Sequence, residues 1–464
     1  SGQAGEMKAG SFLAGCAAPL LALLALSAHA DAELDELLRK LNRGPTDEEM
    51  QFLNDEATKF MPGAQLIHEI KTRDPEGLKA LIADLMALAD EMRYDPERDM
   101  GATPLNTASK RFNGGTLPTP EPLREQERTP GPFSVHRYVY PQSGVPTFAG
   151  ASVAIFPEDL VAGEVEVAII GVPNNASSGR RDAGNAPNAM RALNTIAIRD
   201  MQTGLDPHDA LTIVDYGDFS VDWLTTELSV GHVTDMVAET AKTGAIPMLV
   251  GGDTSMLYPG VKGVARVHGV GSFGLLQLNA HPDADRHGDH TISDRQSMYV
   301  LLHEGIVNGR DTIQFGLRGP DVDGATLSWL RDQEVRYHTM AEIQHRGYDE
   351  VLKRVLREVD RGPDAFFVAV DVSVLHPSDM VAAGRIATSG LRIDDVTHAV
   401  RHVCATKDIV GFEITDLAPM LDFSRLSVLH ANAVLNACIN GMAARKAGVS
   451  PDYVNPLLLD HGQR

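Results

Sequence analysis

The stretch "LQLNAHPDAD" (residues 276–285) is the strongest indication of the fold in this chain. It ends a mainly apolar run that begins at Phe273, which is typical of a strand buried on both faces, and it passes directly into a polar turn. In parallel sheets, binding sites gather at the carboxyl ends of the strands, where such a turn would lie. Histidine and aspartate in this turn favour a metal site, but its first polar residue is Asn279, where a bridging ligand should be a carboxylate. The stretch therefore predicts a parallel α/β sheet and raises the question of whether its metal site is intact.

Short apolar runs of this kind alternate with helical patterns along the rest of the chain. A helical pattern such as "GYDEVLKRVLREVD" (347–360) has apolar residues at three- and four-residue spacing. Alternating strands and helices predict a three-layer αβα fold with a central, mostly parallel sheet. The runs that we expect to form strands lie within residues 165–173, 211–219, 246–253, 273–281, 311–319, 364–372 and 408–419.

Composition divides the chain into four segments. Residues 1–30 contain a short basic start, an apolar run and the small-x-small sequence "AHA", which predict a secretory signal peptide. The protein would then be periplasmic or secreted; the alternative is an uncleaved apolar helix on a cytoplasmic protein. Residues 31–100 have helical periodicity, residues 101–144 form a Pro/Gly-rich arm or linker, and residues 145–464 form the α/β domain.

Charge and cysteine content restrict the possible partners and the folding environment. A formal net charge of −22 without a Lys/Arg cluster argues against nucleic-acid binding. The N-terminal apolar run is too short for a stable membrane span. Beyond that run only Cys404 and Cys438 remain, and both lie in apolar helical patterns, so we expect buried core thiols.

Polar residues follow four of the expected strands, in "GGDTS" (251–255), "NAHPDAD" (279–285), "AVDVSVLHP" (369–377) and "EITDLAP" (413–419). In order and spacing these motifs resemble those of the ureohydrolase superfamily of arginases, agmatinases and guanidino-acid hydrolases. The stretch "GVPNNASSGRRDAGNAPNAMR" (171–191) resembles the opening strand and loop of that family. The resemblance covers roughly residues 145–445 and implies an arginase-like fold.

The resemblance implies a site for two divalent ions, usually manganese and sometimes nickel. In the family, six side chains from the patterns G-G-D-H-S, D-A-H-x-D and D-x-D-x-x-D-P hold the ions, and a hydroxide that bridges them attacks the guanidinium carbon. Shared carboxylates offset the repulsion between two adjacent dications. Three ligand positions match those patterns in this chain, namely His281, Asp283 and Asp371. The other three positions are occupied by neutral residues, namely Thr254, Asn279 and Ser373, which are poor ligands for such ions.

The resemblance also implies two catalytic positions near the metals. Asp416 falls where the family has a glutamate that contacts substrate, and Asp294 falls where it has a histidine that helps in proton transfer. His376 replaces an aspartate before Pro377, and together with His290 it is a possible extra metal ligand. The alternative for His376 is a hydrogen-bonded structural histidine, and for the loop around His290 it is a solvated turn.

Two functions follow from this pattern. The first is a non-catalytic homologue with an eroded dimetal centre, which acts as a structural or regulatory subunit, either in a homo-oligomer (trimer or hexamer) or together with an active ureohydrolase. The alternative is an active amidinohydrolase that acts on a guanidino compound through a single Mn, Ni or Zn ion. A third possibility is binding of a small guanidino ligand without turnover. If the scaffold is otherwise intact, the combined changes Thr254→His, Asn279→Asp and Ser373→Asp should recover dimetal binding.

Overall fold

The computed structural model divides the chain into two compact units, a small helical unit (residues 1–93, with Asp323–Ser328) and a large α/β unit (residues 94–322 and 329–464). It describes residues 45–93, 95, 129–135, 144–176, 182–193, 199–222, 226–286, 292–460 and 462. The predicted signal peptide, nearly all of the Pro/Gly-rich arm and His290 lie outside these ranges. No helix of the described residues is long and apolar enough to cross a membrane.

The described residues of the helical unit form four helices that enclose a core of their own. The core is formed by buried leucine and isoleucine side chains, which include Leu53, Leu66 and Ile82. Thr46 begins the first helix with a capping box to Glu49, in which each side chain satisfies a backbone N–H of the other residue. The four helices are α3 (Asp47–Asp55), α4 (Ala57–Phe60), α5 (Gly63–Thr72) and α6 (Pro75–Met92).

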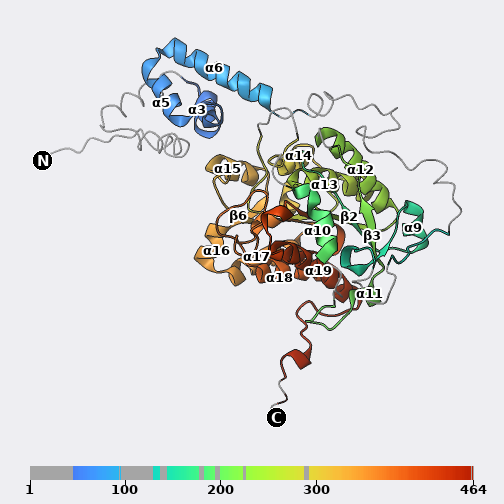
Figure 1. Cartoon of the computed structure of the whole chain (residues 1–464). Helices are drawn as coiled ribbons and strands as arrows, with labels where there is room; N and C mark the ends of the chain where they lie inside the picture. Colours follow the sequence, from blue (N-terminus) through green and yellow to red (C-terminus); the bar gives the residue numbers. More distant parts are fainter. Residues whose placement is uncertain are drawn as a thin grey trace. The chain divides into compact units, whose positions relative to one another are not determined.

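The α/β unit is built on a single sheet of nine strands in which all neighbouring strands are parallel (Figure 1). This confirms the predicted fold, and each of the expected apolar runs contains a strand. In sheet order the strands are β1 (Ser152–Val153), β3 (Ile213–Asp218), β2 (Val167–Gly171), β4 (Ile246–Val250), β9 (Asp408–Thr415), β8 (Ala365–Asp371), β5 (Gly274–Leu278), β6 (Thr312–Leu317) and β7 (Arg336–Thr339).

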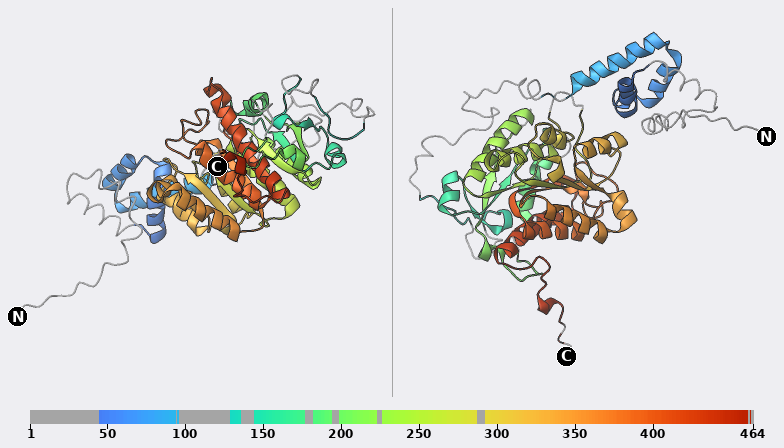
Figure 2. Two further views of the ribbon diagram at one scale, coloured as in Figure 1. Left: turned by 90° about the horizontal axis from the view of Figure 1, so that it is seen from below. Right: turned by 180° about the vertical axis from the view of Figure 1, so that it is seen from behind.

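Helices cover both faces of this sheet, as the right-hand view of Figure 2 shows. Helices α12 and α13 pack together on one face, and α10, α18 and α19 pack together on the other, so that β9 contacts α13 on one side and α19 on the other. Burial on both faces explains why the central strands are nearly continuous apolar runs. Besides three short helices, α9 (Pro157–Ala162), α11 (Pro207–Ala210) and α16 (Met340–Arg346), the helices are α10 (Ala186–Leu193), α12 (Thr226–Lys242), α13 (Leu257–His268), α14 (Ser297–His303), α15 (Gly324–Asp332), α17 (Tyr348–Arg361), α18 (Ile393–Thr406) and α19 (Leu426–Lys446).

Cys404 and Cys438 form a disulfide that joins α18 to α19. Both residues are fully buried, as expected, but the prediction of two core thiols is wrong. The close packing of α18 against α19 brings the two Cα atoms to 5.2 Å across a sequence separation of 34 residues. That separation gave no indication of pairing in the sequence.

Candidate functional site

Four adjacent strands at the centre of the sheet direct their carboxyl ends to one place. The order β4-β9-β8-β5 puts together loops that are far apart in the sequence, and each loop carries one of the polar motifs. The turn after β4 depends on Gly251 and Gly252, which have φ values of 89° and 79°, a region that favours glycine. A Cβ atom on Gly251 would also lie 2.6 Å from the ring of Pro187. These strand ends carry Thr254 after β4, Asp416 after β9, Asp371 and Ser373 at β8, and Asn279, His281 and Asp283 after β5.

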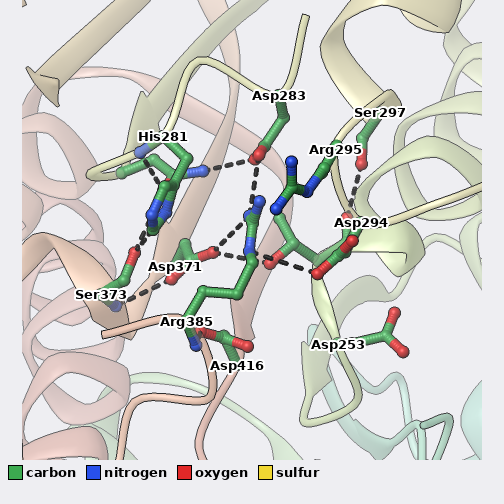
Figure 3. A network of polar contacts seen from close by, with 12 residues as sticks. Asp253, His281, Asp283, Asp294, Arg295, Ser297, Asp371, Ser373, Arg385 and Asp416 are labelled. Atoms are coloured by element: carbon green, nitrogen blue, oxygen red, sulfur yellow. Dashed lines mark hydrogen bonds and ion pairs between the residues drawn. The ribbon is translucent and has the colours of Figure 1, made fainter. Parts of the chain in front are cut away.

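The guanidinium of Arg385 lies among the carboxylates of these loops, as Figure 3 shows. Its Nη2 atom donates to Asp283 Oδ1 at 2.7 Å and to Asp371 Oδ2 at 3.4 Å. Its Nε atom forms an ion pair with Asp294 Oδ2 at 3.3 Å. Arg385 is only 5% exposed, so a single buried cation faces the two carboxylates expected to hold metal and a third expected to act in proton transfer.

The three neutral residues at the remaining ligand positions form hydrogen bonds within the same cluster. Thr254 Oγ1 donates to Asp371 Oδ2 at 2.6 Å, and Asn279 Nδ2 donates to Asp283 Oδ2 at 2.5 Å. Ser373 Oγ lies 3.2 Å from Asn279 Oδ1, and its backbone N–H donates to Asp371 Oδ1 at 2.8 Å. The structure therefore brings these positions together and pairs the side chains of Thr254 and Asn279 with the carboxylates, while the Ser373 hydroxyl contacts Asn279.

Asp416 holds the loop that carries Arg385. Its Oδ2 atom accepts the backbone N–H of Arg385 at 2.7 Å, and its backbone oxygen accepts the N–H of Gly384 at 2.8 Å. Asp416 has a φ of 68°, which non-glycine residues adopt at some energetic cost. The carboxylate at the position of the family's substrate contact is thus bonded to the protein backbone.

Burial controls the ionisation of these groups. Burial raises the pKa of Asp283 to about 7, although the charge of Arg385 acts in the opposite direction. It also raises the pKa of Asp294 and raises that of Asp416 well above its usual value. Burial alone would lower the pKa of Arg385, but the surrounding carboxylates outweigh it and keep the guanidinium charged. The cluster therefore combines a charged guanidinium with carboxyl groups whose pKa values are raised by burial.

His281 is the remaining expected metal ligand. Its Nδ1 atom lies 3.4 Å from Ser373 Oγ, and its backbone N–H donates to Asn279 Oδ1 at 2.9 Å. Burial, with a contribution from the charge of Arg385, lowers the pKa of His281 to about 4, so the ring is neutral near pH 7.

These residues do not fit a pair of divalent ions. Two adjacent dications need shared carboxylates, but the guanidinium of Arg385 already contacts Asp283 and Asp371, and neutral donors fill other oxygen positions. Among the described residues, no group of three or more His, Cys, Asp or Glu side chains is arranged to hold a metal ion.

The possible extra ligand His376 has local partners. Its Nδ1 atom lies 2.8 Å from Ser378 Oγ and accepts the backbone N–H of Ser378 at 3.1 Å. These contacts are those of a hydrogen-bonded structural histidine, which was the alternative for this residue.

Two residues of this region were not among the expected site residues. Arg385 is the single charged residue of the loop "VAAGRIATSG" (381–390). A lone arginine in an otherwise uncharged loop was the signal available in the sequence, because a charged side chain that becomes buried is normally paired. Glu413, within β9, is fully buried, and its Oε2 atom has no hydrogen-bond partner among the described residues. Burial raises the pKa of Glu413 well above its usual value.

Comparison with known proteins gives a consistent family assignment. The arginase family matches residues 165–440, which is more than half of the chain. The chain is 28% identical over 289 residues to the formimidoylglutamase of Bacillus subtilis, with 59% of this chain and 86% of that protein covered. Among solved structures, the proclavaminate amidino hydrolase of Streptomyces clavuligerus is similar in fold, with a TM-score of 0.60 at 22% identity over 66% of this chain and 99% of that one. The Mn²⁺-containing formiminoglutamase of Trypanosoma cruzi has a TM-score of 0.55 at 21% identity and covers 61% and 95% of the two chains. This chain therefore belongs to the arginase family.

Proposed function

We propose that this arginase-family chain is a non-catalytic homologue that acts as a structural or regulatory subunit of an amidinohydrolase assembly. The observation that carries the proposal is the position of Arg385, whose guanidinium pairs with Asp283 and Asp371. In the family these carboxylates would hold the ions that activate the attacking water. A site that holds no metal ion lacks the means by which the family generates hydroxide at neutral pH.

The scaffold around this site remains intact, which favours a role as a subunit. The described residues form a nine-stranded sheet with a continuous buried core, so the residues at the ligand positions are compatible with this scaffold. Large apolar side chains are exposed at Ile386, Met420 and Phe423, and the last of these is 99% exposed. Their segments are adjacent, because Ala418 N donates to Ala382 O at 2.7 Å. Large exposed apolar side chains on neighbouring segments favour a protein–protein contact there.

Metal content tests the proposal directly. The purified full-length protein is incubated with manganese, nickel or zinc, excess metal is removed, and bound metal is measured by elemental analysis, together with a hydrolysis screen on guanidino compounds. We expect no stoichiometric metal and no turnover. About one ion per chain that is lost in His281→Ala, together with turnover, would instead support the single-metal enzyme. Two ions with turnover would overturn the proposal.

A second part of the proposal concerns location. We propose that the chain is exported, because the Cys404–Cys438 disulfide is typical of an oxidising compartment and the N-terminal apolar run has the pattern of a signal peptide. The mass of the intact protein from a native host would test this. Cleavage after Ala30 supports export, whereas an intact N-terminus and free thiols would contradict it.

A further inference from the structure

The loop "VAAGRIATSG" (381–390) places one arginine inside a cluster of acidic groups from several other loops. We propose that this cluster has become a receptor for a guanidinium group, which the chain itself supplies through Arg385. The inference builds on the proposed loss of the metal pair and adds what has taken its place. In this arrangement Arg385 is the ligand of the site. Its positively charged guanidinium contacts the carboxylates that would hold the metal ions in the family.

The geometry fits a guanidinium better than a point charge. Nη2 donates to Asp283 at 2.7 Å and to Asp371 at 3.4 Å, while Nε lies 3.3 Å from Asp294 as an ion pair without a hydrogen bond. A planar guanidinium holds its N–H donors in fixed directions and spreads its charge over three nitrogens, whereas an ammonium group is a single compact centre. One guanidinium can therefore contact carboxylates from three loops at once.

The neutral substitutions complete this receptor. The two oxygens of Asp283 accept from Arg385 and from Asn279, so both are used. The oxygens of Asp371 accept from the backbone of Ser373 and from Thr254, with Arg385 as a further donor. Hydrogen bonds to each oxygen lower the cost of burying these groups beside a single cation. The substitutions at 254 and 279 and the arginine at 385 thus form one arrangement, and Ser373 Oγ contacts it through Asn279 Oδ1.

Asp416 is the positioning residue for this ligand. It accepts the backbone N–H of Arg385, and a Cβ atom on Gly384 would lie only 2.4 Å from its Oδ1 atom. The loop backbone therefore lies directly against Asp416, which fixes the point from which the Arg385 side chain enters the cluster. The carboxylate that contacts substrate in the family here holds the loop in place.

Chemical rescue tests the proposal. Arg385→Ala leaves a guanidinium-shaped gap, so millimolar guanidinium chloride should stabilise this variant while leaving the wild type unchanged. We expect a saturable rise in Tm of about 5 °C when guanidinium is present at about 100 times its dissociation constant. Ionic strength is held constant with sodium chloride. Urea serves as the neutral probe of the same shape, and tetramethylammonium as the cation without N–H donors.

Arg385→Met is the matched control, because its side chain fills the gap without charge and leaves no room for the probe. Stabilisation of Arg385→Ala by guanidinium, with no response to the other probes or in Arg385→Met, supports the receptor. No response of folded Arg385→Ala to guanidinium, or an equal response to tetramethylammonium, overturns it. If Arg385→Ala does not fold alone, it is refolded from urea with and without guanidinium: recovery only with guanidinium supports the receptor, and failure in both overturns it. Metal uptake by the wild type would instead refute the proposed function.

Discussion

A double-mutant cycle on Arg385 and Asp283 would measure how far the buried cation stabilises the α/β unit. Their side chains are 5% and 0% exposed and the pair is 2.7 Å apart. Removing one partner of such a buried pair leaves the other charge uncompensated, which costs about 3–5 kcal/mol. We therefore expect Arg385→Met to lower the free energy of unfolding by about that amount, measured at pH 8 because burial raises the pKa of Asp283 to about 7.

Asp283→Asn and the double variant complete the cycle. Asp283→Asn should cost less, about 1–2 kcal/mol, because Arg385 keeps Asp371 and Asp294 as partners. In the double variant no ionised Asp283 remains to be left unpaired, so its cost should fall below the sum of the single costs by at least about 2 kcal/mol.

Urea unfolding followed by tryptophan fluorescence is a suitable assay. Residues 1–93 contain no tryptophan, so the signal reports the α/β unit and not the helical unit. Urea is used in place of guanidinium chloride because urea is uncharged, whereas the salt would screen the ion pairs under test. Arg310→Met is the surface control, since its side chain is 71% exposed and its change should be below about 0.5 kcal/mol. If the cost of the double variant equals the sum of the costs of Arg385→Met and Asp283→Asn within about 0.5 kcal/mol, the coupling is refuted.

Three further predictions concern other parts of the α/β unit. Replacing Cys404 and Cys438 by alanine should lower the free energy of unfolding by about 4 kcal/mol, from the entropy of closing a loop of 34 residues, and a loss below about 1 kcal/mol in urea would contradict this. Burial lowers the pKa of His338, but hydrogen bonds to two glutamates outweigh this effect and raise the pKa above 6.5. The stabilising contribution of His338 should therefore be lost as pH rises above that value. We expect His338→Gln to flatten the dependence of Tm on pH between about 6 and 8. An unchanged slope would contradict that assignment. Gly384→Ala should force the loop away from Asp416 and lower Tm by several degrees, about 5 °C, and an unchanged Tm would show that the loop moves freely.

The fold could be predicted from the sequence because its central strands are buried on both faces. Runs such as "DAFFVAVDV" (364–372) have no polar face, which distinguishes a covered parallel sheet from most other arrangements. Two strands were not predicted because they lack such a run. Strand β1 (Ser152–Val153) has two residues, and β7 (Arg336–Thr339) is an edge strand with polar, partly exposed residues, so neither has a continuous apolar run.

The site could be predicted less completely. The site residues at the strand ends could be predicted because each lies within a few residues of a predicted strand. The order of the motifs along the chain then assigned each residue to its loop. Arg385 was missed because its place depends on where a long loop after β8 folds back, and no periodicity encodes that path. The contact that decides it, from the Arg385 backbone to Asp416, joins residues 31 positions apart. Loop packing, and not strand pattern, therefore determines the chemistry of this site.

That conclusion changes what a restored metal centre requires. Thr254→His, Asn279→Asp and Ser373→Asp return the ligand types of the family, but they add carboxylates to a cluster that still contains the Arg385 guanidinium. A cation already bound to Asp283 competes with any ion, and entropy favours it because it is tethered to the chain. We expect the triple variant to bind little manganese and the quadruple variant with Arg385→Thr, which removes the guanidinium, to bind about two ions per chain. Elemental analysis of both variants beside the wild type provides the comparison, with Arg385→Thr alone as the control for the loop. If the triple variant takes up as much manganese as the quadruple variant, the guanidinium is not what keeps metals out, and the loss of ligands alone would explain the site.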